Sequence, residues 1–202
     1  MLIKCLPVGN LEANCYVVTD ESTLSCAVID PGDESNTILD YIESNHLKVE
    51  AILLTHGHFD HTSAAETVSE ETGAEIWINA ADACEERREF YKYHAPAGTR
   101  YYSDGDIVTV GALRFRVMET PGHSEGSVTL QCQDALFTGD TLFADSCGRT
   151  DLPGGDMKKL LKSLLRLADI PGNLEVWPGH MGPTTLDRER EGNYYIRYAA
   201  GK

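Results

Sequence analysis

Three histidines and one aspartate fall within six consecutive residues, 56–61, inside the segment THGHFDH. The apolar segment 49–54 comes directly before it and predicts a buried strand. In an extended backbone His56 and His58 point to the same side, whereas Asp60 and His61 fall on the first turn of the next predicted helix. Four side chains that can bind metals therefore gather at the end of a strand, where α/β layers collect their ligands.

An isolated histidine is more often a hydrogen-bonded structural residue than a metal ligand, and that is the alternative interpretation. Three histidines this close together are different, because like-charge repulsion opposes protonating all of them at once. A bound cation removes the conflict, since it coordinates neutral imidazoles together with a carboxylate. We therefore predict a metal site in this segment.

Three further motifs place a histidine or an aspartate after a predicted strand. His123 follows 113–118, Asp140 follows 135–138, and His180 follows 174–177. The four strand ends carry seven candidate ligands: His56, His58, Asp60, His61, His123, Asp140 and His180. Seven exceeds the four of a closed structural zinc site, so the set suits two metals with three ligands each, one bridge and a position left for water. Imidazole and carboxylate without thiolate fit Zn, Fe or Mn. For Asp140 alone, a turn or capping residue is the alternative.

The rest of the chain alternates strand and helix patterns. Strands are predicted at 2–6, 14–19, 25–30, 49–54, 76–78, 107–110, 113–118, 127–132, 135–138 and 174–177, and helices at 36–46, 61–72, 80–91, 157–168 and 186–198. Asp156 is predicted to cap the helix 157–168. No linker divides the chain, so we expect one domain over 1–202, an α/β layered fold with two sheets face to face and helices outside.

The charge balance limits the partners. Lys plus Arg number 17 and Asp plus Glu number 32, a formal net charge of −15. Such an acidic chain lacks the basic footprint that nucleic acids and anionic membranes require. No signal-peptide core follows Lys4, and the longest aliphatic run, 51–54, is too short to cross a bilayer. The six cysteines form no CxxC pair. We expect a cytoplasmic protein without nucleic-acid or membrane partners, and the sequence leaves its oligomeric state open.

The order HxHxDH, distant histidine, aspartate and last histidine resembles the metal signature of the metallo-β-lactamase superfamily. The resemblance extends to Asp30-Pro31-Gly32, Pro121-Gly122-His123-Ser124, Thr138-Gly139-Asp140-Thr141 and Pro178-Gly179-His180. It implies an αββα sandwich of two mixed sheets with the site at one edge. It also implies that His56, His58 and His123 hold one metal, that Asp60, His61 and His180 hold a second, and that Asp140 bridges them.

Within that superfamily the chain looks like the glyoxalase II-like, or hydroxyacylglutathione hydrolase-like, group. The segments 147–151 (CGRTD) and 152–156 (LPGGD) resemble its short, single-domain bacterial members. Only 22 residues follow His180, so the helical C-terminal domain with which glyoxalase II binds glutathione is expected to be absent. The resemblance implies a hydrolase of thioesters such as S-lactoylglutathione that uses two divalent metal ions, zinc first, with iron or manganese as alternatives.

In the implied mechanism the nucleophile is a metal-bound hydroxide, because metals lower the pKa of bound water toward neutrality. Asp60 and Asp140 are the side chains expected to take part in catalysis, as ligands around that hydroxide. No serine or cysteine nucleophile is required. Cys147 is therefore interpreted as a turn or packing residue.

Further residues are candidates for supporting roles. Asp30 is a candidate hydrogen-bond partner of a ligand histidine, and a simple turn carboxylate is the alternative. Arg149 is the candidate substrate-binding cation, with a surface ion pair to Asp151 as the alternative. The aromatic residues of 90–94 and 101–102 are candidates for a pocket wall, with local packing as the alternative.

Other functions on the same fold remain as rivals. A persulfide dioxygenase uses one iron held by two histidines and a carboxylate, and the Cys-Gly-Arg-Thr-Asp run occurs in that group too. An RNA-processing nuclease is disfavoured by the charge of −15. A non-catalytic metal-binding module does not explain seven ligands with an open position. A β-lactamase proper is expected to be secreted and often uses a cysteine ligand where Asp140 stands here. A small-molecule thioester is therefore the expected substrate.

Overall fold

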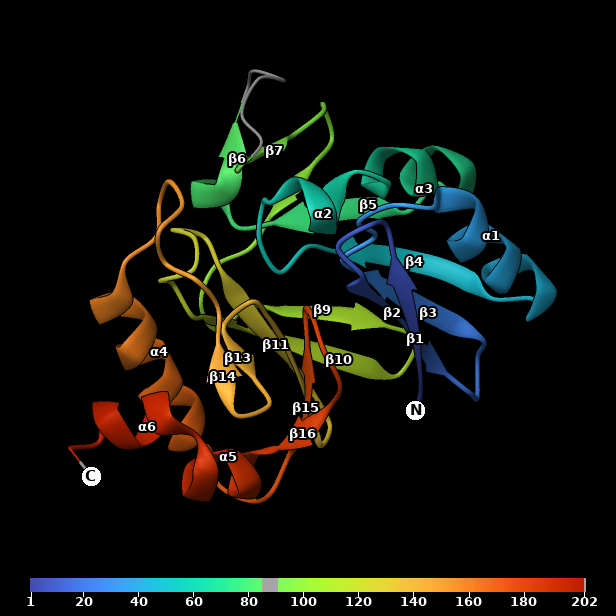
Figure 1. Ribbon diagram of the computed structural model, residues 1–202. Coiled ribbons are helices and arrows are strands. Elements are labelled where there is room, and N and C mark those ends of the chain that lie inside the picture. The colour runs from blue at the N-terminus through green and yellow to red at the C-terminus, as the bar shows by residue number, and fades with distance from the viewer. Residues whose placement is uncertain (85–90, 202) are drawn as a thin grey trace.

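The computed structural model describes residues 1–84 and 91–201 and contains two six-stranded sheets packed face to face (Figure 1). The strands are β1 (Leu2–Val8), β2 (Ala13–Asp20), β3 (Ser25–Ile29), β4 (Lys48–Leu53), β5 (Glu75–Ile78), β6 (Ala83–Cys84), β7 (Tyr93–His94), β8 (Arg100–Tyr101), β9 (Ile107–Val110), β10 (Leu113–Glu119), β11 (Val128–Cys132), β12 (Ala135–Gly139), β13 (Leu142–Phe143), β14 (Ser146–Cys147), β15 (Glu175–Pro178) and β16 (Thr184–Thr185). The helices are α1 (Ser35–Ser44), α2 (Phe59–Thr62), α3 (Ala65–Thr72), the 3-10 helix η1 (Ala80–Asp82), α4 (Met157–Ala168), α5 (Leu186–Gly192) and α6 (Tyr194–Ala199).

Both large sheets are mixed. The first has the order β1-β2-β3-β4-β5-β8, antiparallel from β1 to β3 and parallel from β3 to β8. The second has the order β16-β15-β12-β11-β10-β9, and within it β12 and β15 are parallel. Strands β2 and β3 are buried along their whole length, because the second sheet covers one face and helices cover the other.

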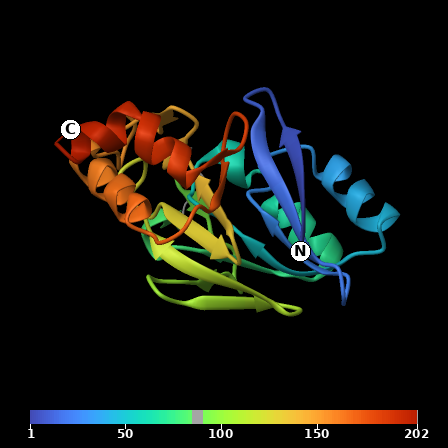
Figure 2. The ribbon, with the colours of Figure 1, turned by 90° about the horizontal axis from the view of Figure 1, so that it is seen from below.

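Three apolar layers hold the sandwich together. The central layer lies between the sheets and includes Phe115 and Phe137. A second layer, with Ile38 of α1 and Val68 of α3, covers the outer face of the first sheet. A third, which includes Leu164 of α4, covers the outer face of the second. Figure 2 shows the blue and teal helices on one side of the sheets and the orange and red helices on the other. This αββα arrangement confirms the predicted fold.

The start of α4 is fixed by the cap that the sequence predicts. Asp156 Oδ1 accepts hydrogen bonds from the backbone N–H groups of Lys158 and Lys159, at 2.8 and 3.1 Å. We expect Asp156→Ala to lower the free energy of unfolding by about 1 kcal/mol, the usual value of such a cap. Urea unfolding of the variant beside the wild type measures this. An unchanged midpoint would show that the cap adds no stability.

Three predicted helices differ from the structure. The helix expected at 61–72 is two helices, α2 and α3, and the one expected at 186–198 is divided between α5 and α6. Asn193 makes the second break, because its side chain accepts hydrogen bonds from the N–H groups of Tyr195 and Ile196 and so caps a new helix. The helix expected at 80–91 is wrong at its start, where η1 and β6 occupy 80–84, and 85–90 lie outside the described residues.

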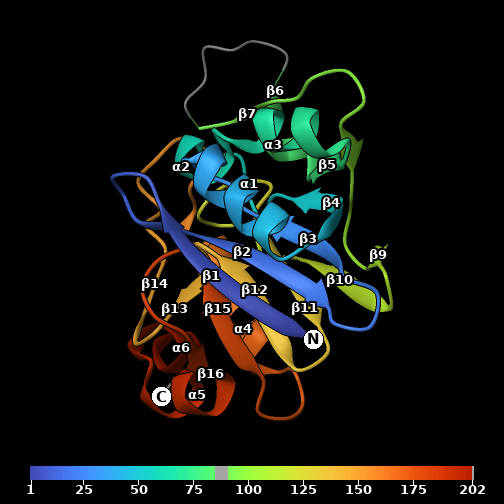
Figure 3. The same cartoon turned by 90° about the vertical axis from the view of Figure 1, so that its right-hand side faces the viewer.

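The view in Figure 3 shows α1 and α3 beside β4 and β5, and α5 and α6 at the other end of the molecule. Several two-residue strands, such as β13 and β14, have too few residues for a periodic sequence signal. Within 1–84 and 91–201, no helix is both long enough and apolar enough to cross a membrane.

Candidate metal centre

The structure brings all seven predicted ligand residues together at one edge of the sandwich. β4 leads into the loop with His56 and His58, β10 is followed by His123, Asp140 comes directly after β12, and His180 follows β15. His61 and Asp60 lie on the short helix α2 that follows the β4 loop. The structure therefore places these residues at the ends of the strands, where the sequence predicts them. Donor atoms of six of these residues and of Asp30 form three overlapping groups: His56, His58 and His123; Asp60, His61 and His180; and Asp30, His56 and His61.

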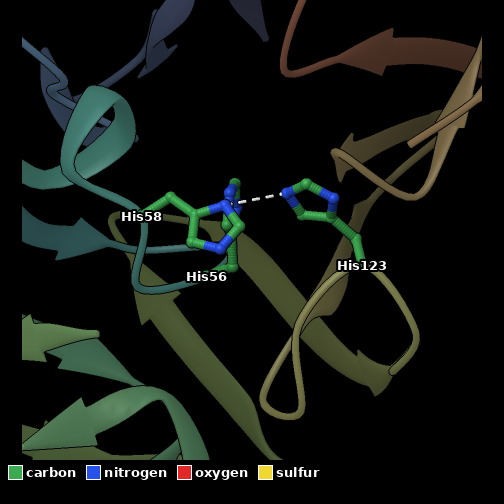
Figure 4. Close-up of side chains that lie close together, drawn as sticks. All are labelled: His56, His58 and His123. Atoms are coloured by element: carbon green, nitrogen blue, oxygen red, sulfur yellow. Dashed lines mark hydrogen bonds between the residues drawn. The ribbon is translucent and has the colours of Figure 1, made fainter. Parts of the chain in front are cut away.

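The first histidine cluster consists of His56, His58 and His123, each offering a ring nitrogen within 4.8 Å of the others. Figure 4 shows the three rings turned toward one another, with a 2.9 Å contact between His58 Nδ1 and His123 Nε2. His123 Nδ1 lies 2.8 Å from the carbonyl oxygen of Arg149 and must donate to it, which leaves Nε2 as a bare acceptor. His56 Nδ1 contacts Thr55 Oγ1 at 3.0 Å, so its Nε2 is also left for the centre.

The second cluster consists of Asp60, His61 and His180. The Nε2 atoms of His61 and His180 are 3.3 Å apart. Asp60 Oδ2 lies 3.4 Å from His180 Nε2 and 3.8 Å from His61 Nε2. Two imidazole nitrogens and a carboxylate oxygen therefore converge on one point.

Asp140 lies between the two clusters. Its Oδ1 is 3.5 Å from His61 Nε2, and its Oδ2 is 3.5 Å from His123 Nε2 and 3.7 Å from His180 Nε2. One carboxylate thus directs one oxygen to the second cluster and shares the other between both. This is the arrangement expected of a side chain that joins two cation positions.

The donor atoms themselves fit a metal. His56 Nε2 and Asp140 Oδ1 are buried and have no hydrogen-bond partner among the described residues. Buried polar atoms are nearly always hydrogen-bonded, whereas Asp140 Oδ1 has no hydrogen bond beyond its 3.5 Å approach to His61 Nε2, and His56 Nε2 has none among the described residues. Nitrogen and carboxylate oxygen without thiolate are ligands for Zn, Fe or Mn. The residues present therefore fit divalent metal ions.

Electrostatics differ between the two clusters. Burial, reinforced by neighbouring histidines, lowers the pKa of His56 well below its usual range and that of His58 to about 4. Both are neutral at pH 7, the form that coordinates metals. Burial also opposes charge on His61, but Asp140 and Asp30 outweigh it and raise the His61 pKa to about 9. Carboxylates that favour a proton here favour a metal cation for the same reason.

Asp30 contacts the second cluster through the His61 ring. It is buried, and its backbone has a φ of +49°, in the left-handed region that aspartate tolerates better than most residues. Oδ1 accepts from the Thr55 N–H at 2.7 Å, and Oδ2 accepts from Thr55 Oγ1 at 2.6 Å and faces His61 Nδ1 at 3.1 Å. Asp30 therefore orients His61, and the structure places it where the sequence suggests a partner of a ligand histidine.

Two supporting residues were missed by the sequence analysis. Asn14 Nδ2 donates to the carbonyl oxygens of Pro178 and Met181, at 2.9 and 2.8 Å, and Tyr16 Oη donates to Pro178 at 2.6 Å. Both lie on β2 and hold the loop that carries His180. The only signal was a polar amide in a strand whose other residues are mostly apolar, because its partners lie more than 160 residues away.

A cavity of about 590 Å³ opens over the two clusters. Exposed apolar side chains form much of its rim, among them Leu11, Phe59 and Met181. Of the predicted aromatic wall, Tyr91 lines the cavity, whereas Tyr102 is buried in the central core. Phe90, which belongs to the same prediction, lies outside the described residues.

Arg149 and Cys147 also line the cavity. The Arg149 Nε and Nη2 atoms each donate to the Asp151 carboxylate at 2.7 Å, in an exposed pair. Arg149 therefore has both features that the sequence suggested, a position beside the site and a pair with Asp151. Burial raises the pKa of the Cys147 thiol to about 11, so it is protonated at neutral pH and unsuited to be a nucleophile.

Residues 8–180 match the metallo-β-lactamase superfamily. A hydroxyacylglutathione hydrolase, GloC of Haemophilus influenzae, is 31% identical over 209 residues, which cover 97% of this chain and 98% of that protein. The chain belongs to the metallo-β-lactamase superfamily. Its members include metal-dependent hydrolases and bind divalent metals, in agreement with the chemistry of the two clusters.

Solved structures of this superfamily have the same fold. The BLEG-1 B3 metallo-β-lactamase matches with a TM-score of 0.87 and 30% identity, over 96% of this chain and 99% of that one. TTHA1623 in a di-iron-bound form matches with a TM-score of 0.82 and 33% identity, over 96% of this chain and all of that one. The second comparison is with a protein of similar length whose structure holds two iron ions.

Proposed function

We propose that this superfamily member is a two-metal hydrolase of thioesters, with S-lactoylglutathione as the reference substrate. The observation that carries the proposal is the position of Asp140, whose two oxygens face His61 and His123 at 3.5 Å each. The likeness to GloC, a hydroxyacylglutathione hydrolase by name, supports the choice of substrate class. The di-iron neighbour supports the choice of two metals.

The ligands divide between the two clusters. His56, His58 and His123 would hold the first metal, Asp60, His61 and His180 would hold the second, and Asp140 would be shared between them. Zinc suits this set, and iron or manganese suits it as well. Two divalent cations bound there supply a water of lowered pKa and a Lewis acid for the substrate carbonyl.

The residues of the chain have two tasks in the reaction. Asp60 and Asp140 balance the positive charge of the centre with carboxylates. The apolar rim receives the thioester and excludes water from one side of it. No side chain needs to act as the nucleophile, in keeping with the protonated thiol of Cys147, and the departing thiolate is stable enough to leave without a strong acid.

We further propose that the enzyme acts in the cytoplasm on a small-molecule substrate rather than on a nucleic acid or at a membrane. The net charge of −15 repels polyanions. No disulfide joins any two of the six cysteines, all of which lie among the described residues, as a reducing compartment allows.

Steady-state hydrolysis of a thioester panel by zinc-loaded and iron-loaded protein tests the proposed activity. The panel includes S-lactoylglutathione and an acyl thioester without glutathione, and we expect turnover of at least one of them. Oxygen uptake with glutathione persulfide is measured in parallel. Oxygen uptake without any thioesterase activity would make the protein a dioxygenase and contradict the proposal.

Arg149 gives a prediction about substrate binding. An exposed ion pair contributes up to about 1 kcal/mol, so Arg149→Ala should raise KM for an anionic thioester up to about fivefold. Because the contact lies away from the reacting carbonyl, kcat should change little. Asp151→Asn frees the guanidinium from its present partner and should lower KM. If the two variants move KM in the same direction, Arg149 acts only as a loop anchor.

A further inference from the structure

One buried carboxylate near the centre belongs to neither cluster. Asp82 ends the 3-10 helix η1 after β5 and is only 1% exposed. The turn that carries it is fixed by Asn79, whose side chain accepts from the Ala81 N–H at 3.0 Å and whose carbonyl accepts from the Asp82 N–H at 3.0 Å. The Asp82 side chain is therefore held by a rigid local turn.

The Asp82 carboxylate joins the two loops that carry the first histidine cluster. Oδ2 accepts from the Gly57 N–H at 2.9 Å, and Gly57 is the residue between His56 and His58. Oδ2 also accepts from the Ser124 hydroxyl at 2.6 Å, directly after His123. Oδ1 accepts from the Gly126 N–H at 2.7 Å, on the same loop.

The two glycines leave room for this contact. A Cβ atom on Gly57 would lie 2.5 Å from the carbonyl oxygen of Asp82, and one on Gly126 would lie 2.8 Å from its Cγ. Both backbones therefore pass directly against Asp82, closer than any residue with a side chain could. The contact therefore depends both on the Asp82 carboxylate and on the two glycines whose N–H groups donate to it.

We propose that Asp82 is the positioning residue of the first histidine cluster, setting the separation between His58 and His123 by anchoring both of their loops. The inference rests on the proposed metal-binding role of these histidines. It assigns Asp82 no contact with substrate or metal. The second cluster lies on α2 and on the loop after β15, where Asp30 and Asn14 provide the supporting hydrogen bonds instead.

An isosteric amide separates this role from simple space-filling. Three donors point at two oxygens of Asp82, and asparagine offers one oxygen and one NH₂ group. In either orientation of the amide, at least one donor of the protein faces another donor. Asp82→Asn therefore keeps the volume and loses part of the anchor.

The test measures zinc occupancy at each cluster separately. Crystals of the wild type and of Asp82→Asn are equilibrated at the same buffered free zinc concentrations, and anomalous scattering gives the occupancy of each position. We expect the zinc affinity of the first cluster to fall about 10- to 100-fold, as for other residues that orient metal ligands. The affinity of the second cluster should stay unchanged.

Two further variants keep the test decisive. Asp20→Asn is the matched control. Asp20 is also a buried carboxylate, and it joins two turns through Ala112 and Ser22. It is the last residue of β2, at the opposite end of that strand from Asn14. It should leave both occupancies unchanged. Ser124→Ala removes one of the three donors and should lower the zinc affinity of the first cluster by a smaller factor than Asp82→Asn does. This variant still tests the proposal if Asp82→Asn does not fold.

The outcomes separate the two claims. If the wild type fills both positions and the variants lower both equally, or neither, Asp82 is not the positioning residue. If the wild type itself never fills both positions, the proposed two-metal function fails instead. Selective loss at the first cluster supports both.

Discussion

Replacing Asp140 with alanine should lower the affinity for both metals and the thioesterase activity together, by at least about 100-fold. Residues that only orient a metal ligand already contribute 10- to 100-fold to affinity, and Asp140 faces both clusters directly. Its loss also leaves the histidines without the carboxylate between them. Zinc titration against a chromophoric chelator, together with steady-state kinetics, measures the two effects.

Asp134→Ala is the control for this variant. It removes the same charge six residues earlier, at an exposed position in the turn before β12, and should leave both quantities unchanged. If Asp140→Ala lost activity but retained both metals at wild-type affinity, the carboxylate would not be a shared ligand.

Metal removal should give the second large effect, a fall in thermal stability. Free metal at one hundred times its dissociation constant stabilises a folded protein by about 2.7 kcal/mol per site, so two sites give about 5 kcal/mol. For a chain of this size that corresponds to a change in Tm of about 10 to 20 °C. Thermal unfolding of chelator-treated and zinc-reconstituted protein, followed by circular dichroism, measures the shift.

The Asp140→Ala variant serves here as well. Its Tm should depend far less on added zinc than that of the wild type, because its sites are weakened while the fold is kept. Equal Tm values for the stripped and the reconstituted wild type would show that no metal binds selectively to the folded state.

The placement of the site could be predicted from the sequence because it follows from strand ends. His56, His123 and His180 each come shortly after an apolar strand pattern, and the layered fold brings such ends to one edge. The αββα layers follow from the same alternation of strand and helix patterns. The cap at Asp156 is local as well, and it was predicted for that reason.

What the sequence did not reveal depends on contacts between distant segments. Asn14 binds a loop more than 160 residues away, and Asp82 anchors residues on either side of it, at 57 and 126. Neither residue belongs to a local pattern. The break inside the helix predicted at 186–198 has a similar origin, because Asn193 not only caps α6 but also donates from Nδ2 to the carbonyl oxygen of Ser146, 47 residues earlier.

The number of metal ions bound per chain in the active protein tests the central claim most directly. Elemental analysis of protein saturated with zinc, and separately with iron, should give close to two ions per chain in the preparation that hydrolyses thioesters fastest. Activity should rise until the second ion is bound. Full thioesterase activity with a single ion per chain, however much metal is supplied, would contradict the two-metal account.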